Sequence, residues 1–147
     1  MQISIEAFVN SLICNEKIKE ICKLDFVNYK GSCYRAIKHS NIIALSINDF
    51  LPSIMERNNN EMPDTETQLK HKKYKDYSVS LNESLEKLKE IVQFVPTLRD
   101  SVCSYAIGYF SKTKGVITKP ESNGHIHYFL FDPKGKNPVS DFRFIVE

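Results

Sequence analysis

The residues from 124 to 131 read Gly124-His125-Ile126-His127-Tyr128-Phe129-Leu130-Phe131, and this stretch decides the fold. It combines β-branched and aromatic side chains between two turn-forming pairs, Asn123-Gly124 and Asp132-Pro133, and such a pattern predicts a β-strand. Both faces of the strand are mainly apolar, which is typical of a strand inside a sheet. We therefore predict that this strand lies near the centre of a β-sheet.

The composition fits one domain of ordinary size, and we expect a single domain over residues 1–147. Nine Phe and seven Tyr supply a core, although the chain has no Trp. The formal net charge of +2 is nearly balanced. Strong nucleic-acid binders usually carry a larger basic excess, so a nucleic-acid partner is not expected.

The sequence lacks the marks of secretion and of membrane insertion. No basic segment followed by an apolar run stands at the start, and no apolar stretch approaches the roughly 20 residues that cross a bilayer. The four cysteines lie in apolar or amphipathic segments, where reduced, packed thiols are the usual state. Cys33 is expected to be the most accessible of them and Cys103 to lie in a core strand. We predict a cytoplasmic protein without a membrane partner.

Helical periodicity dominates the first part of the chain and strand alternation the last third, which predicts an α+β fold with a mostly antiparallel sheet. The clearest helix is expected over 81–95, with Ser80 and Glu83 in the pattern of a capping box. Further helices are predicted for 4–24 and 49–57, the second burying Phe50, Leu51, Ile54 and Met55. Strands are predicted for 33–38, 76–79, 101–112, 115–118 and 138–146.

Residues 58–76 carry no periodic pattern, and they include a basic cluster. A structureless segment of this length is uncommon inside a compact domain, so we expect either a functional flap or a flexible loop. The cluster can attract an acidic partner or can remain a solvated loop. Its lysines, the candidate partner-binding residues, are Lys70, Lys72, Lys73 and Lys75.

His125 and His127 are the first candidates for chemistry. Alternation along a strand places both imidazoles on one face, about 7 Å apart. This geometry suits an acid and a base, suits two metal ligands, or leaves two structural histidines beside a turn. No cysteine or carboxylate stands nearby at a recognised zinc spacing, so we predict no metal.

Arg35 is the second candidate, because a cation in a largely buried strand requires a partner. A structural salt bridge to Asp141 or Glu147 is one interpretation. The other is a guanidinium that lines a pocket and holds a phosphate or carboxylate.

The Tyr34-Arg35 strand is followed by Ser78-Val79-Ser80 and the helix expected over 81–95. Over about residues 33–95 this order is similar in outline to ADP-ribosyltransferases and the related RES-type toxins. The resemblance implies that Arg35 and the serines help to hold NAD. The sequence departs from that family in one respect, because no glutamate lies inside a late strand. Glu121 lies in a turn instead.

Two classes of function follow. The first is a small intracellular interaction or accessory protein of bacterial or phage origin, with a protein partner or a second copy of the chain and with no cofactor. The second is a small transferase or hydrolase, related to toxins or defence, that handles NAD or a nucleotide. Its candidate catalytic residues are Arg35, Ser78, Ser80, His125 and His127.

Overall fold

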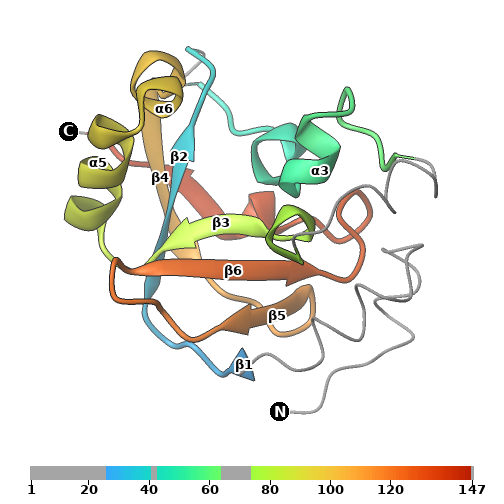
Figure 1. The fold of residues 1–147 in the computed structure, drawn as a ribbon. Coiled ribbons are helices and arrows are strands. Elements are labelled where there is room, and N and C mark those ends of the chain that lie inside the picture. Colours follow the sequence, from blue (N-terminus) through green and yellow to red (C-terminus); the bar gives the residue numbers. More distant parts are fainter. Residues whose placement is uncertain (1–25, 41–42, 64–73, 147) are drawn as a thin grey trace.

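A computed structural model describes residues 26–40, 43–63 and 74–146 (Figure 1). Within these residues one seven-stranded sheet has the order β1-β5-β6-β3-β2-β4-β7, and every neighbouring pair is antiparallel. The strands are β1 (Phe26–Val27), β2 (Ser32–Ile37), β3 (Val79–Asn82), β4 (Ser104–Tyr109), β5 (Gly115–Thr118), β6 (His125–Leu130) and β7 (Phe142–Phe144). The predicted antiparallel sheet is therefore confirmed, and the few helices around it fit the expected α+β class.

Strand β6 lies inside the sheet, between β5 and β3, as its two apolar faces predict. All of its residues except His125 are buried. The predicted hairpin with β5 is also present, with Val116 opposite Phe129. Strand β6 is therefore a buried strand in the interior of the sheet, as predicted.

The sheet opens between β2 and β3. These two strands share one register pair, Tyr34 with Asn82, whereas β2 pairs with β4 along its whole length. Figure 1 shows the consequence, because β2 and β4 run steeply across the direction of β3 and β6. Away from the shared pair, the backbone groups that face the opening need other partners.

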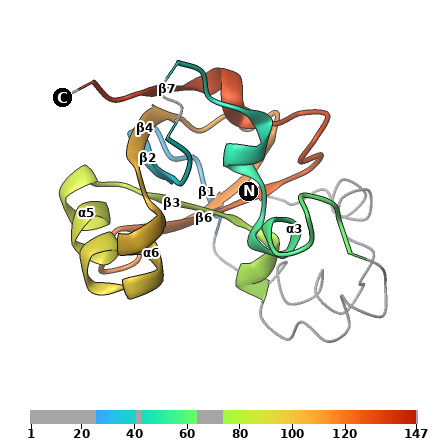
Figure 2. The same ribbon diagram turned by 90° about the horizontal axis from the view of Figure 1, so that it is seen from above.

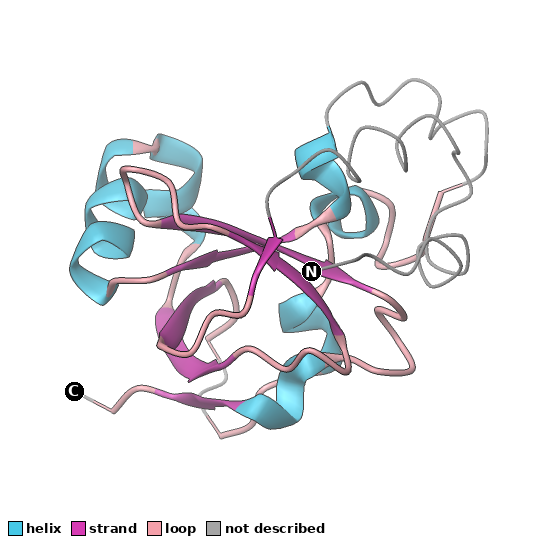
Figure 3. Ribbon diagram, turned by 90° about the horizontal axis from the view of Figure 1, so that it is seen from below, coloured by secondary structure: helices cyan, strands magenta, loops and turns pink. Residues whose placement is uncertain are grey.

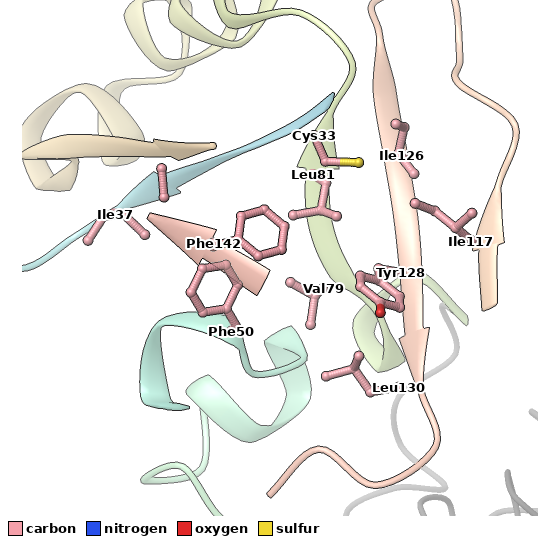
Figure 4. Packing of buried hydrophobic residues seen from close by; sticks show 11 residues of the cluster. Cys33, Ile37, Phe50, Val79, Leu81, Ile117, Ile126, Tyr128, Leu130 and Phe142 are labelled. Carbon is pink, nitrogen blue, oxygen red and sulfur yellow. The ribbon is translucent and has the colours of Figure 1, made fainter. Parts of the chain in front are cut away.

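Two groups of buried side chains hold the fold together. The larger group contains Phe50 and Phe142, whose ring centroids lie 4.7 Å apart, with Tyr128 and Leu81 nearby (Figure 4). The smaller group joins Phe129 of β6 to the segment around α3. Burial of each such large apolar side chain contributes roughly 1.5–3 kcal/mol.

Short helices surround the sheet. They are η1 (Ile47–Phe50), α3 (Ser53–Glu56), η2 (Tyr74–Tyr77), α5 (Leu85–Phe94), α6 (Pro96–Ser101) and η3 (Pro138–Asp141). Figure 2 shows α5 and α6 at one end of β3 and β6 and α3 at the other end, and Figure 3 shows the same arrangement from below. No helix in the described ranges is long and apolar enough to cross a membrane.

The helix expected over 49–57 consists of two short pieces. Ser46 and Asp49 form a capping box that starts η1, and α3 begins after Pro52, which has no backbone N–H to donate. The predicted burial is confirmed, because the four apolar residues of this segment are at most 2% exposed. They are Phe50, Leu51, Ile54 and Met55.

The helix expected over 81–95 starts later than predicted. Leu81 lies in β3 and pairs with Ile126, and Ser80 lies in the same strand instead of capping a helix. The helix begins at Leu85, where Ser84 is the cap and accepts a hydrogen bond from the N–H of Lys87. The sheet ladder therefore overrides the helical spacing of the leucines.

The strand expected over 33–38 is present as β2, whereas three other strand predictions are partly wrong. The segment expected as a strand over 101–112 begins in α6, and only Ser104–Tyr109 joins the sheet. The segment 138–146 contributes Phe142–Phe144, after the turn of η3. In place of a strand over 76–79, η2 ends at Tyr77 and β3 begins at Val79. The helices predicted for 4–24 lie outside the described residues.

Candidate functional site

A pocket of about 350 Å³ lies where the sheet opens between β2 and β3. Helices α5 and α6 close it on one side and α3 on the other. Three of the candidate residues line it, namely Arg35, Ser80 and His125. The volume is near the lower end of the range of small-molecule sites.

Arg35 bridges the opening in the sheet. Its side chain is 11% exposed and donates to three acceptors: Nη1 to Ser80 O at 2.9 Å, Nε to Asp49 O at 3.0 Å, and Nη2 to Glu56 Oε1 at 2.8 Å. The partner carboxylate is thus Glu56. Of the two expected partners, Asp141 binds Lys114 instead, at 2.8 Å, and Glu147 lies outside the described residues. The guanidinium therefore donates to one backbone carbonyl in β3, that of Ser80, and to one in η1, that of Asp49.

His125 and His127 lie closer together than the strand repeat suggests, with ring centroids 4.4 Å apart. His127 is 3% exposed and Ser78 is fully buried. The Nδ1 atom of His127 lies 3.1 Å from Ser78 Oγ, and its Nε2 atom lies 3.0 Å from Glu121 Oε2. Ser78 also donates its hydroxyl proton to Lys75 O, at 2.9 Å.

Both histidines are neutral at pH 7. Burial, with the neighbouring His125 ring as the next cause, lowers the pKa of His127 to about 4, although the Glu121 carboxylate acts in the opposite direction. Burial also lowers the pKa of His125. The positive charge of Lys75 adds to the lowering of the pKa at each ring. Each imidazole therefore carries one proton for two ring nitrogens.

Ser78, His127 and Glu121 form a chain with the residue types of a hydrolase triad. A nucleophilic serine must reach its substrate. Ser78 has no exposed surface and its hydroxyl points to a backbone carbonyl. This arrangement gives a substrate no route to the hydroxyl, so the chain of contacts is better suited to orienting His127.

Glu121 is the functional candidate that sequence reasoning missed. With His125 and His127 it forms a group of metal-ligand type, in which one ligand atom of each residue lies within 4.8 Å of the others. The prediction of no metal rested on the absence of a cysteine or carboxylate at a recognised zinc spacing, and the structure brings the carboxylate of Glu121 to the two histidines. The signal was the spacing Glu-x-x-x-His-x-His, with a hairpin turn that folds the glutamate back onto the strand.

The five predicted catalytic residues therefore separate into two sets. Arg35, Ser80 and His125 line the pocket, whereas Ser78 and His127 lie outside its lining and contact each other. Of the predicted partner-binding lysines, Lys75 is described and is exposed. The others, Lys70, Lys72 and Lys73, lie outside the described residues.

The accessibility of two cysteines is the reverse of the prediction. Cys33 is 0% exposed, because its position in β2 faces the core, and burial raises the pKa of its thiol to about 12. Cys103 lies just before β4 and is exposed. A buried thiol with a raised pKa is a poor nucleophile, so Cys33 offers no chemistry to the site.

Comparison of the chain with protein-family models, with curated proteins and with solved structures gave no match in any of the three. The geometry of the site is therefore the basis for assigning a function.

Proposed function

We propose that the protein binds a small organic anion, a carboxylate or phosphate joined to an apolar group, in the pocket between β2 and β3. The observation that carries the proposal is the combination of cationic and apolar side chains around one opening. Sites for small ligands pair an apolar lining with a few placed polar groups.

The cationic side of the pocket carries more positive than negative charge. Arg35, Lys38 and Arg57 line it, and Glu56 is the one carboxylate among its lining residues. Glu56 is shared, since it contacts Arg35 at 2.8 Å and Lys38 at 3.5 Å. The side chains of Lys38 and Arg57 are 51% and 62% exposed. Arg57 Nη1 lies 3.3 Å from Asp76 Oδ1. Exposed ion pairs of this kind contribute little free energy, so both cations can turn toward a ligand.

The opposite side of the pocket is apolar. Leu88, Ile91 and Val92 of α5 and Leu98 of α6 contribute to its lining. An anion without an apolar part would leave this surface in contact with water, at a cost of about 25 cal/mol for each Å² left uncovered. The expected ligand is therefore amphipathic, and the volume suits a metabolite smaller than a dinucleotide.

Binding of matched probes tests the proposal. We expect phenyl phosphate and benzoate to bind in calorimetric titrations and benzyl alcohol to bind more weakly or not at all. The affinity of the anions should fall as NaCl is raised, because salt screens exposed charges. Lys38→Ala and Arg57→Ala should each weaken anion binding by about fivefold.

Arg99→Ala is the matched control, because Arg99 is an exposed arginine of α6 that does not line the pocket. The Arg99→Ala variant should bind the anions with the same affinity as the wild-type protein. Equal binding of the anions and of benzyl alcohol, or an equal loss in Arg99→Ala, would contradict the proposal.

A second candidate is the NAD-handling transferase. The presence of Arg35, Ser80 and His125 along one pocket favours it. Against it, the guanidinium of Arg35 already has three protein acceptors. Incubation with NAD, followed by mass spectrometry of the nucleotide and of the protein, tests it. Release of nicotinamide that is lost in His125→Gln would support the transferase, and unchanged NAD would exclude it.

A macromolecular partner, as expected for an interaction or accessory protein, stays a prediction. Lys75 is the described member of the basic cluster that suggested it.

A further inference from the structure

The hairpin that joins β5 to β6 brings one carboxylate and two imidazoles together, from Glu121, His125 and His127. One ligand atom of each lies within 4.8 Å of the others. Atoms bound at 2.0–2.1 Å to one tetrahedral Zn²⁺ lie roughly 3.3 Å apart. The donors are therefore at most about 1.5 Å from the spacing that a single ion requires, a shift that side-chain rotation can supply.

The turn holds Glu121 in place beside the histidines. Its backbone N–H donates to His125 O at 2.9 Å, and its carbonyl accepts from the N–H of Gly124 at 2.8 Å. Gly124 has a φ of +81°, and a Cβ at this position would lie 2.4 Å from Asn82 Oδ1. A glycine is required there, and the backbone of the three candidate ligands forms one fixed unit.

His125 has a ring nitrogen to which the described residues offer no hydrogen bond. Its Nε2 atom is shielded from solvent and makes no hydrogen bond with any residue that the structure describes. Buried side-chain nitrogens are rarely left in this state. A bound cation beside the ring would supply the missing partner.

The contact between His127 and Glu121 is also one that a bound cation can satisfy. Ser78 gives its hydroxyl proton to Lys75 O, so its oxygen is left to accept the Nδ1–H of His127. The Nε2 lone pair then faces Glu121 Oε2 at 3.0 Å. Two acceptor atoms at this distance require a proton or a cation between them. A hydrogen bond from the other ring nitrogen is the usual way in which a metal-binding histidine is oriented.

We propose that Glu121, His125 and His127 form a binding site for one divalent transition-metal ion, with Ser78 as the residue that orients His127. Two imidazoles and one carboxylate are the donor set of zinc sites that keep a fourth position open for water or a ligand. The ion would reach the site past Glu121, whose side chain is 44% exposed. The inference rests on the geometry of the hairpin and not on the proposed anion binding, although His125 also lines the pocket.

Metal titration of chelator-treated protein tests this site. We expect one equivalent of Zn²⁺ to bind in calorimetry and in native mass spectra, and Co²⁺ to give the intense visible absorption of a tetrahedral site. Glu121→Gln and His125→Gln should each weaken Zn²⁺ binding at least about tenfold. Ser78→Ala removes no ligand, and it should weaken binding by about tenfold through the loss of orientation at His127.

The chain offers matched controls in its other two histidines. His39 also contacts a carboxylate, and its Nδ1 atom also makes no hydrogen bond with a described residue. Among the described residues, however, it belongs to no group of three metal-ligand side chains. His71 lies outside the described residues. His39→Gln and His71→Gln should bind Zn²⁺ as the wild type does. Circular dichroism of every variant separates loss of a ligand from loss of folding. Absence of Zn²⁺ and Co²⁺ binding, or binding that survives in Glu121→Gln and His125→Gln, would overturn the proposal.

Discussion

Two histidine–carboxylate pairs in the described part of the chain have nearly the same contact distance and differ in which member is buried. His39 Nε2 lies 2.9 Å from Asp49 Oδ2, and His127 Nε2 lies 3.0 Å from Glu121 Oε2. In the first pair the histidine side chain is 33% exposed and the carboxylate 9%. In the second, the histidine is 4% exposed and the carboxylate 44%.

The other contacts of each pair explain this difference. Asp49 accepts the backbone N–H of Ser46 at 2.7 Å and completes the capping box of η1, so this carboxylate is part of the fold. His127 is the structural member of its pair, because its backbone N–H donates to Thr118 Oγ1 and its ring contacts Ser78. Glu121 keeps its carboxylate at the surface. The Asp49 carboxylate therefore stabilises the fold, whereas the Glu121 carboxylate remains accessible to a ligand.

The largest expected effect is on folding stability. His127→Ala should lower the free energy of unfolding by about 2–4 kcal/mol, because it opens a cavity and leaves the buried Ser78 hydroxyl with one contact fewer. His39→Ala removes a partly exposed ring and should cost less than about 1 kcal/mol. Urea denaturation measures both variants. Equal losses of stability in the two variants would contradict the structural role given to His127.

The second expected effect is on the pH dependence of stability in chelator-treated protein. The pKa of His127 is about 4 in the folded state and 6.5 in the unfolded state, so the unfolded chain binds more protons between these values. Stability should therefore fall as the pH is lowered from 6.5 toward 4, by up to about 1.4 kcal/mol for each pH unit. Denaturation at several pH values should show this slope in His39→Gln, and His127→Gln should lose most of it. A slope unchanged in His127→Gln would contradict the assignment.

The smallest expected effect compares the two acids. Asp49→Asn should destabilise the protein by about 1 kcal/mol, because an amide oxygen accepts the Ser46 N–H less strongly than a carboxylate does. Glu121→Gln changes an exposed side chain and should shift stability by less than about 0.5 kcal/mol. Thermal denaturation in the presence of a chelator resolves this order. A larger loss in Glu121→Gln would show that its carboxylate is a structural group.

Local sequence patterns were sufficient to predict much of the fold. The strand over 124–131 and its hairpin with 115–118 follow from side-chain alternation and turn residues that are close in sequence. Leu81 shows the kind of position at which local patterns do not decide the secondary structure. Leu81 fits a helical stripe with Leu85 and also fits strand alternation with Val79, and its pairing with Ile126 in the sheet decides between the two. Ser80 and Ser84 can both cap a helix, and only Ser84 precedes one.

The candidate site divides in the same way. The sequence by itself determined that His125 and His127 share a face, because the side-chain period of a strand is two residues. It also indicated that Arg35 needs a partner, since a buried cation is costly. Only the tertiary structure decided that this partner is Glu56, that Ser78 lies behind His127, and that Glu121 reaches its ring. These contacts depend on strand register and on the path of a turn, and both are settled by packing between segments distant in the chain.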